Sequence, residues 1–269
     1  MKLLVVGSGG REHAVIRKLK ENKEIKKIYC APGNGGISAD AECVDIKATD
    51  KENMVKFAKE NAIDFCVVTP DDPLALGMVD VMEEAGIPCF GPKANAAIIE
   101  ASKAFSKDLM KKYGIPTADY ETFDNEKDAL HYIEEKDTFP VVIKADGLAL
   151  CKGVLICETL DDAKTALREM MVEHVFGLSG NKVVVEEFMT GKEVSVLAFT
   201  DGNVVKPMIS SMDHKRAYDN DEGLNTGGMG TIAPSPYYTK EIAETCMETI
   251  FLPTVKAMNA EGRTFKGCL

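Results

Sequence analysis

The fold is decided by residues 141–156, VVIKADGLALCKGVLI. Two runs rich in valine and isoleucine flank a loop with two glycines, and this order of β-branched residues and glycine predicts a β-hairpin. The loop differs from a Walker phosphate-binding loop, because Gly153 follows Lys152 where that motif has Ser or Thr at a helix start. We therefore expect a flexible flap between two strands, with Lys144 and Lys152 able to bind a polyphosphate. An exposed basic hairpin tip is the structural alternative.

The chain around the flap has an α+β pattern that begins after Gly114. We expect a strand at 117–123, helices at 125–136 and 160–176, strands at 183–188, 193–200 and 204–210, a glycine-rich loop at 223–230 and a helix at about 239–260. The last residues, GRTFKGCL (262–269), predict a turn into a strand that has barely begun. We expect that this domain is incomplete and that its open sheet edge favours self-association.

The residues before position 94 alternate strand and helix signals, as in an α/β fold. We expect strands at 3–6, 27–31, 63–69 and 87–91, and helices at 11–22, 51–62 and 74–85. These elements predict a doubly wound parallel sheet. A long helical pattern at 94–114 follows and ends at Gly114. We place one domain at residues 1–100 and a second at 101–269.

The composition limits the classes of partner. A chain of 269 residues is long enough for two domains. Its 32 Lys and Arg against 43 Asp and Glu give a net charge of −11, which disfavours nucleic acid and anionic membranes as partners. The sequence has neither a membrane-spanning apolar stretch nor a signal-peptide pattern, so we expect a cytoplasmic protein. The eight cysteines form no C-x-x-C pair, and most are expected to be buried reduced thiols.

Two glycine loops follow neighbouring strands of the predicted parallel sheet. GSGGREHA (7–14) opens a helix and is typical of a phosphate site, with a tight structural turn as the alternative. Glu12 stands where a dinucleotide-binding loop has its third glycine, which argues against a dehydrogenase. APGNGG (31–36) ends the neighbouring strand, so we expect both loops to face one crevice.

Three further polar residues near these loops are ambiguous. His13 lies in the first helical turn and is read as a packing or capping residue without a chemical role. Asp71 and Asp72 follow a strand, where they could contact a sugar hydroxyl or start a helix.

Several motifs occur in a fixed order: GSGGREHA, APGNGG, EASK, VIKADGLA, VVVEEF, EVSVLAFTDG, DHKRAYD and NTGGMG. The segments from EASK to EVSV resemble the ATP-grasp fold, and the whole set resembles the phosphoribosylamine–glycine ligase family within it. The resemblance covers residues 1–269 without a large insertion. It implies a doubly wound parallel α/β N-terminal domain, followed by an α+β ATP-grasp domain that is truncated at its C-terminus and has a lid at about 115–188.

The resemblance also implies an activity: ATP-dependent ligation of glycine to 5-phosphoribosylamine through a glycyl phosphate, in purine biosynthesis. The ATP-binding residues that it implies are Lys103, Lys144, Gly147, Lys152, Gly153, Glu186, Glu187, Phe188 and Glu193, with adenine at the main chain of 186–188 and ribose at Glu193. The implied substrate-binding residues are Gly7, Gly9, Gly10, Arg11, Glu12, Asn34, Gly35 and Gly228. The implied catalytic residues are Lys144, Asp213, Lys215, Arg216 and Asn225.

The chemistry of this reaction fits a positively charged flap. Transfer of a γ-phosphoryl group to a carboxylate brings two anions together, so the site needs lysines and Mg²⁺ or Mn²⁺. A flap that closes over an acyl phosphate also excludes the water that would hydrolyse it. We therefore expect the flap to be both a lid and a phosphate clamp.

Two departures from the family pattern affect this expectation. Cys151 stands where the family has glycine, which places a thiol near the phosphates. The metal ligands of the family are expected beyond Leu269, so we assign no metal ligand in this chain and expect weak ATP binding and poor turnover from it. We expect the parent enzyme to be a monomer.

Three alternatives stay open at this point. The chain could be another ATP-grasp carboxylate–amine ligase, a non-catalytic nucleotide-binding fragment, or, less consistent with the loops, a nicotinamide oxidoreductase.

Overall fold

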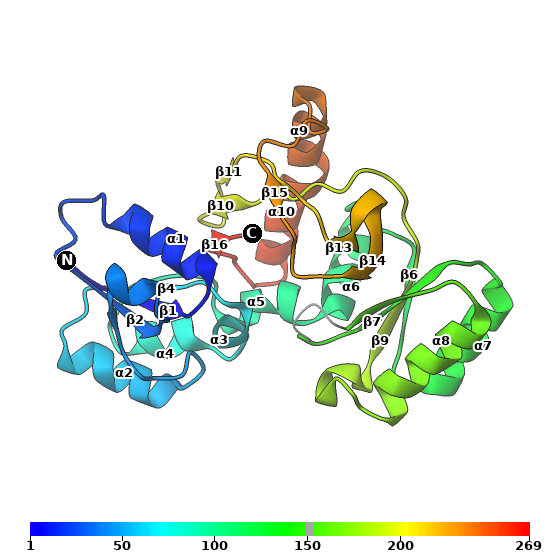
Figure 1. Ribbon diagram of the computed structural model, residues 1–269, viewed down its shortest axis with the longest axis horizontal. Helices are drawn as coiled ribbons and strands as arrows, with labels where there is room; N and C mark the ends of the chain where they lie inside the picture. Colours follow the sequence, from blue (N-terminus) through cyan, green and yellow to red (C-terminus); the bar gives the residue numbers. More distant parts are fainter. Residues whose placement is uncertain (149–152) are drawn as a thin grey trace. The chain divides into compact units, whose positions relative to one another are not determined.

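The computed structural model describes residues 1–148 and 153–269, which form two compact units (Figure 1). The first unit comprises Met1–Ile98 with Arg263–Cys268, and the second comprises Ile99–Gly262 with Leu269. The mixed α/β class expected from the sequence is confirmed in both.

The first unit is a parallel sheet with the strand order β3-β2-β1-β4-β5. Its strands are β1 Lys2–Gly7, β2 Lys27–Pro32, β3 Glu42–Cys43, β4 Phe65–Val68 and β5 Cys89–Phe90. Its helices are α1 Gly10–Leu19, the 3₁₀ turn η1 Ile37–Ala39, α2 Lys51–Glu60, α3 Asp71–Ala75 and α4 Met78–Glu84, and α5 Ala94–Ala101 begins in it. Strand β1 reads as a continuous apolar run because it is covered on both faces.

Helices cover both faces of this sheet, as the doubly wound prediction requires. Leu4 and Val6 pack with Met54 of α2 and Met82 of α4, whereas Val5 on the opposite face packs with α1. Figure 1 shows α1 on one side of β1 and β2, with α2 and α4 on the other. The carboxyl ends of β1 and β2 therefore point to the same edge, where Gly7 pairs with Pro32.

Two helices expected from the sequence are each divided. The helix expected at 74–85 is α3 and α4, separated by Gly77, whose φ of 85° interrupts a right-handed helix. The helix expected at 94–114 is α5 and α6 (Lys103–Tyr113). Ser102 begins the second of these by accepting a hydrogen bond from the Phe105 amide at 3.1 Å, as a helix N-cap does.

The second unit contains the predicted hairpin within an antiparallel sheet of order β6-β9-β7-β8. The strands are β6 Tyr120–Phe123, β7 Val141–Ala145, β8 Val154–Cys157 and β9 Val183–Glu187. Helices α7 (Glu126–Lys136) and α8 (Leu160–Leu167) lie side by side on one face of the sheet, and their apolar side chains share a core with β7 and β9. The π-helical turn η2 (Arg168–Val172) and the 3₁₀ turn η3 (Gly177–Asn181) complete this part.

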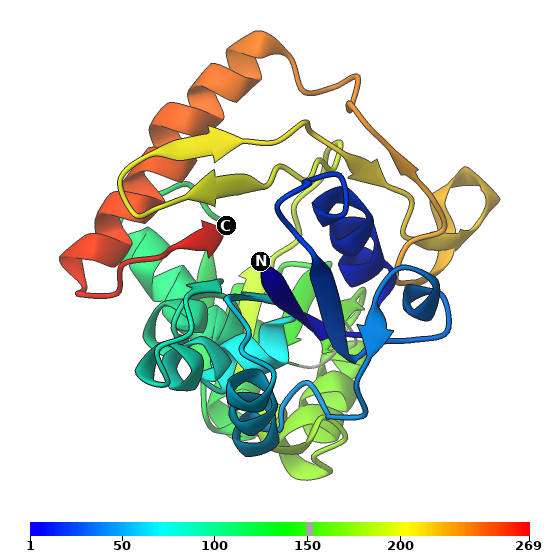
Figure 2. The same ribbon diagram turned by 90° about the vertical axis from the view of Figure 1, so that its left-hand side faces the viewer.

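The rest of the second unit is a set of short strands beside a long helix. Strands β10 (Ala198–Thr200) and β11 (Val205–Pro207) pack through Ala198 and Val205 on Phe251 and Val255. Phe251 and Val255 belong to a long helix that consists of α9 (Lys240–Cys246), the π-helical η5 (Met247–Phe251) and α10 (Leu252–Ala260). Figure 2 shows this helix running beside β10 and β11.

The strand expected at 193–200 is regular only over β10, and part of the loop expected at 223–230 is strand. The additional elements are β12 Met212–Asp213, β13 Arg216–Tyr218, η4 Asp219–Asp221, β14 Glu222–Asn225, β15 Thr231–Ile232 and, in the first unit, β16 Gly267–Cys268. Strands β12 and β15 pair with each other, as do β13 and β14.

Two sequence expectations concern the molecule as a whole. Within residues 1–148 and 153–269, the helices are too short or too polar to cross a bilayer. Among the cysteines that the structure describes, Cys30, Cys66 and Cys157 are buried and Cys43 is exposed, and all are free thiols. Burial raises the pKa of Cys30 to about 12 and that of Cys157 to about 11.

Candidate functional site

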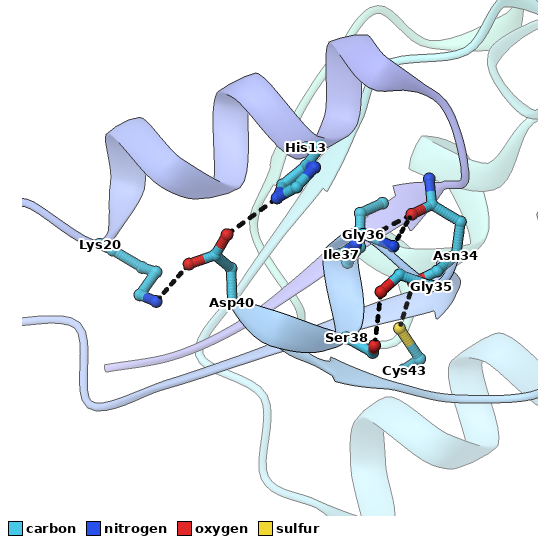
Figure 3. A network of polar contacts seen from close by, with 9 residues as sticks. All are labelled: His13, Lys20, Asn34, Gly35, Gly36, Ile37, Ser38, Asp40 and Cys43. Carbon is cyan, nitrogen blue, oxygen red and sulfur yellow. Dashed lines mark hydrogen bonds and ion pairs between the residues drawn. The ribbon is translucent and has the colours of Figure 1, made fainter.

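The two glycine loops of the first unit lie side by side. The Gly33 amide donates to the Gly7 carbonyl at 3.0 Å, and the Asn34 Nδ2 atom donates to the Ser8 carbonyl at 2.7 Å. The Oδ1 atom of Asn34 also accepts from the amides of Gly36 and Ile37 (Figure 3). Asn34 thus connects both loops, so the two loops are adjacent in the structure.

Glu12 shapes the first loop from within. Its side chain is 4% exposed, and its two oxygens accept hydrogen bonds at 2.6 Å from the Gly9 amide and the Thr69 hydroxyl. A Cβ atom on Gly7 would lie 2.6 Å from the Cγ atom of Glu12. Glu12 was expected to contact substrate, but both of its carboxylate oxygens accept hydrogen bonds from within the protein. Its side chain lies against Gly7, at the position where a dinucleotide-binding loop has its third glycine.

The outer side of the loops is open. A Cβ atom on Gly10 or Gly35 would meet no other atom within 4 Å, and Arg11 is exposed. Packing therefore does not require glycine at positions 10 and 35, although it does at Gly7. The helix N-terminus at Gly10 carries backbone N–H groups of the kind that bind anions.

A cluster of charged side chains lies beside the second loop (Figure 3). The Asp40 carboxylate accepts from the Lys20 ammonium at 2.6 Å and is 2.8 Å from the Nε2 atom of His13. Hydrogen bonds from Lys20 and His13 lower the pKa of Asp40 to about 2. His13 thus packs against the loop, as expected. Asp71 and Asp72 form the first turn of α3, the helix-start alternative.

In the second unit, the beginning of α6 is attached to the end of β7. The Asp146 carboxylate accepts from the Ser102 hydroxyl at 3.0 Å and from the Ala104 amide at 2.6 Å. The Lys103 ammonium donates to the Gly147 carbonyl at 3.0 Å. Lys103 and the base of the flap are therefore held together.

A buried carboxylate joins two lysines next to the flap. Glu186 on β9 is 6% exposed, and its oxygens pair with the ammonium groups of Lys107, at 2.7 Å, and Lys144. Lys144 lies on β7 beside β9, and 29% of its side chain is exposed. The arrangement contains two cations and one anion, so it presents a net positive charge through Lys144.

The flap itself is only partly described. A Cβ atom on Gly147 would lie 2.6 Å from the Ser179 Oγ atom, so packing on η3 already requires this glycine. The Gly153 carbonyl accepts from the Ala145 amide at 2.8 Å and closes the hairpin. Lys152 and Cys151 lie outside the described residues.

At the end of β9, a hydrogen-bonded glutamate is followed by an exposed aromatic side chain. The Glu187 side chain accepts from the Asp119 amide at 3.1 Å, and the Glu187 amide donates to the Asp119 carbonyl at 3.0 Å. The side chain of Phe188 is partly exposed directly after the strand. Because β9 has a neighbouring strand on each side, backbone groups of 186–187 take part in the sheet, and those after Glu187 lie beyond it.

A second charged group is built from Glu193, Asp213 and Lys215. The Lys215 ammonium pairs with the Glu193 carboxylate and lies 3.9 Å from the Oδ1 atom of Asp213, beyond hydrogen-bond distance. That Oδ1 atom is buried and has no hydrogen-bond partner among the residues that the structure describes. A buried carboxylate oxygen without a donor is costly, which makes it a place where a ligand can donate.

Backbone contacts join this charged group to the glycine-rich segment that follows. The Arg216 guanidinium donates to the Gly223 carbonyl at 2.7 Å, and the Thr226 amide donates to the Lys215 carbonyl at 2.7 Å. Gly228 has a φ of 115°, a conformation that side chains disfavour. The backbone of Asn225 lies in β14 opposite Arg216, and its side chain is outside the described part of the chain.

Comparison with known proteins bears on the whole chain. A family model described as the N domain of phosphoribosylglycinamide synthetase matches residues 1–100, and one described as its ATP-grasp (A) domain matches residues 101–269. The chain belongs to the phosphoribosylglycinamide synthetase family. The resemblance inferred from the motifs is thereby confirmed.

Individual members of the family are similar over the full chain. It is 50% identical over 270 residues to the phosphoribosylamine–glycine ligase of Listeria monocytogenes serotype 4b, covering 100% of this chain and 64% of that protein. The crystal structure of the Thermotoga maritima phosphoribosylamine–glycine ligase superimposes with a TM-score of 0.84 at 30% identity, covering 100% of this chain and 64% of that one. The chain thus spans 64% of the length of these relatives.

The wider fold family is represented by a biotin carboxylase domain. That of Hydrogenobacter thermophilus 2-oxoglutarate carboxylase, solved with MgADP, ADP and bicarbonate, superimposes with a TM-score of 0.75 at 21% identity, covering 100% of this chain and 63% of that one. At this identity the likeness shows a shared fold alone.

Sequence reasoning missed Lys107 and Asp146. Asp146 carried a signal, since an acidic residue directly after an apolar strand is well placed to cap a neighbouring helix. Lys107 carried little signal, because one lysine among several on an amphipathic helix reads as solvent-exposed. Within the described ranges, no three His, Cys, Asp or Glu side chains gather as a metal site.

Proposed function

We propose that this chain carries the nucleotide and substrate sites of an ATP-dependent phosphoribosylamine–glycine ligase. The observation that carries the proposal is the net positive group of Lys107, Glu186 and Lys144 next to the base of the flap. In this proposal residues 1–100 bind the phosphate of phosphoribosylamine, and residues 101–269, with a lid at about 115–188, bind ATP.

The nucleotide end uses positive charge that the protein fixes in advance. Lys144 and Lys103 meet the ATP phosphates, and Lys152 and Gly153 of the flap cover them. Adenine contacts the backbone near Phe188, beyond the hydrogen-bonded part of β9, and Glu193 accepts from the ribose. The lysine ammonium groups are held in place before the reaction, so they need not move during it. They stabilise the negative charge that develops as the γ-phosphoryl group is transferred from ATP.

The amino-acid end uses the charged group at β12 and β13. The buried Oδ1 atom of Asp213 accepts a hydrogen bond from the ammonium group of the substrate glycine. Lys215 and Arg216 attract the carboxylate of the substrate glycine. Glycine's carboxylate oxygen attacks the γ-phosphorus, ADP leaves, and glycyl phosphate forms. The amine of phosphoribosylamine then attacks the carbonyl carbon, phosphate leaves, and the new amide nitrogen loses a proton, with Asn225 and the backbone at Gly228 next to the acyl phosphate.

The phosphoribosylamine end uses the glycine loops of the first unit. The amides at Gly10 and Arg11 lie at a helix N-terminus, and the open surface at Gly10 and Gly35 leaves room for a phosphate. Glu12 contributes by fixing the loop, since its oxygens are already used by Gly9 and Thr69. Gly7 and Asn34 hold the two loops together.

ATP with Mg²⁺ or Mn²⁺ is the cofactor that we propose for the reaction. The ion supplies charge neutralisation between the phosphates. The residues that the structure describes offer no cluster of ligands for it, so we derive no step through the ion. A cytoplasmic location and a monomeric parent enzyme complete the proposal, and light scattering of the full-length parent enzyme tests the second.

The test is ADP release by the 269-residue chain with Mg-ATP, measured with and without glycine and phosphoribosylamine, together with ATP binding by calorimetry. Turnover that requires both substrates supports the ligase in full. ATP binding without turnover supports the nucleotide site and assigns the chain to the non-catalytic alternative. Turnover with a different carboxylate substrate, or no ATP binding, contradicts the proposal.

A further inference from the structure

Lys107 is an unusual lysine for its place on an amphipathic helix. It is 8% exposed, and its ammonium donates to the Thr117 hydroxyl at 2.8 Å and to the Ala118 carbonyl at 3.0 Å. It also lies 5.2 Å from the centre of the Tyr120 ring. Buried lysines are rare unless they are paired, and this one is fixed by neutral groups on three sides.

The Lys107 ammonium also forms an ion pair with the Oε2 atom of Glu186 at 2.7 Å, although that oxygen accepts no hydrogen bond from the residues that the structure describes. The other oxygen of Glu186 pairs with Lys144, whose side chain is partly exposed. The chain of contacts therefore runs from an immobile cation, through a buried carboxylate, to a cation that can reach a ligand. Since Lys107 and Glu186 are both buried, the position of the carboxylate is fixed by a group that no ligand displaces.

We propose that Lys107 is a positioning residue: it holds Glu186, and Glu186 holds the Lys144 ammonium where it meets the nucleotide phosphates. The inference rests on the proposed nucleotide site and adds to it a residue that touches neither nucleotide nor substrate. Lys107 also shares the negative charge of Glu186. Without Lys107, that whole charge acts on Lys144, draws the ammonium toward the interior and leaves less positive charge for a phosphate.

The first test is ATP affinity, measured by calorimetry for the whole chain. We expect Lys107→Met to weaken ATP binding by about tenfold, the size of a coupling between contacting charges. The matched control is Lys111→Met, because Lys111 lies one helical turn further along, is exposed, and is 5.4 Å from the same Tyr120 ring without an ion pair to Glu186. We expect this control to stay within about twofold of the wild type.

A double variant separates positioning from packing. If Lys107 acts through the carboxylate, adding Lys107→Met to Glu186→Gln changes ATP affinity by less than about twofold, although the same substitution alone costs about tenfold. An equal loss in both backgrounds would mean that Lys107 only supports the fold, and would overturn the inference. Thr117→Val is the milder variant if Lys107→Met fails to fold, since it removes one contact of Lys107 and keeps every charge.

The second test needs no nucleotide and measures how fast acetic anhydride labels Lys144. We expect slower labelling in Lys107→Met, because the ammonium is held more tightly, and faster labelling in Glu186→Gln, because it is released. The double variant should match Glu186→Gln. If wild-type chain fails to bind ATP while these rates shift as expected, the proposed nucleotide site is wrong and the link from Lys107 to Lys144 stands. Unchanged labelling in Lys107→Met would refute that link.

Discussion

Glu12 in the first unit and Glu186 in the second are carboxylates of similar burial, 4% and 6% exposed, with different partners. Glu12 accepts from a backbone amide and a hydroxyl, whereas Glu186 is held between two ammonium groups. The hydrogen bonds of Glu12 hold the backbone of the loop at Gly9, so this carboxylate determines the shape of the loop. The ion pairs of Glu186 hold side-chain ammonium groups, so this carboxylate determines the position of Lys144.

The difference concerns how each unit would bind an anion in the proposed ligase. In the first unit the proposed donors for a phosphate are backbone amides, whose direction depends on the loop. In the second unit the proposed donors are side-chain ammonium groups, whose direction depends on the residues that hold them. Under this proposal each unit has a buried carboxylate behind its anion site, although the carboxylate itself repels anions. The net charge stays favourable at Glu186 because the cations outnumber it.

The largest expected effect is on Glu186. Glu186→Leu leaves Lys107 buried without a counter-ion, and we expect the free energy of unfolding to fall by about 3–5 kcal/mol. Adding Lys107→Met should restore most of that loss, because an apolar pair replaces an unpaired charge. Urea unfolding of the two variants measures both effects. A loss below about 1 kcal/mol in Glu186→Leu would show that the ion pair is not closed to water.

Removing the Glu12 carboxylate should lower the free energy of unfolding by less than Glu186→Leu does. A second substitution should recover only part of that loss. Glu12→Ala leaves the Gly9 amide and the Thr69 hydroxyl without their acceptor, and we expect a loss of about 2–3 kcal/mol in urea unfolding. Thr69→Val in the same background recovers only the hydroxyl's share, since the amide of Gly9 cannot be removed. The control is Glu21→Ala, an exposed carboxylate with one surface ion pair. Full recovery in the double variant would contradict the role of the amide.

The fold could be predicted from the sequence where the signal is local. The hairpin of β7 and β8 follows from two apolar runs around glycines, and the parallel sheet follows from alternating strand and helix patterns. The insertion of β9 between β6 and β7 could not be predicted, because pairing of distant strands depends on tertiary packing. The helix break at Gly77 had a visible signal, since glycine within a helical pattern lowers its stability.

The candidate site could be predicted less completely. The structure brings Lys103 to the flap base and Lys215 to Glu193 and Asp213, and the pairing of Lys215 with Glu193 was not expected from the motifs. The partners of Glu186 include Lys107, whose burial depends on how α6 packs against β9, and no pattern within α6 reports that. Sequence motifs therefore identify ligand-contacting residues more readily than they identify the residues that position them.

Asn34 offers a third step in the comparison, with a neutral side chain in place of a carboxylate. It is exposed, so we expect Asn34→Ala to lower the free energy of unfolding by only about 1 kcal/mol, for the lost bonds to Ser8, Gly36 and Ile37. Asn34→Asp keeps the acceptor for the two amides and removes the donor to Ser8. Thermal unfolding of both variants should therefore rank the aspartate between wild type and alanine. The reverse order would mean that the bond between the loops dominates.

Asp40 is the partly exposed counterpart of Glu186, a carboxylate with the two basic partners Lys20 and His13, and its effect should be the smallest. Its folded pKa of about 2 lies below the ordinary 3.8, so its contribution to stability is complete above the ordinary value and is lost as the pH falls toward 2. The stability difference between wild type and Asp40→Asn should therefore be complete near pH 5 and shrink below pH 4. Urea midpoints at a series of pH values measure it, with Asp45→Asn as a control of equal charge change. A difference that grows on acidification would reverse the sign and show that Lys20 and His13 do not stabilise the ionised form.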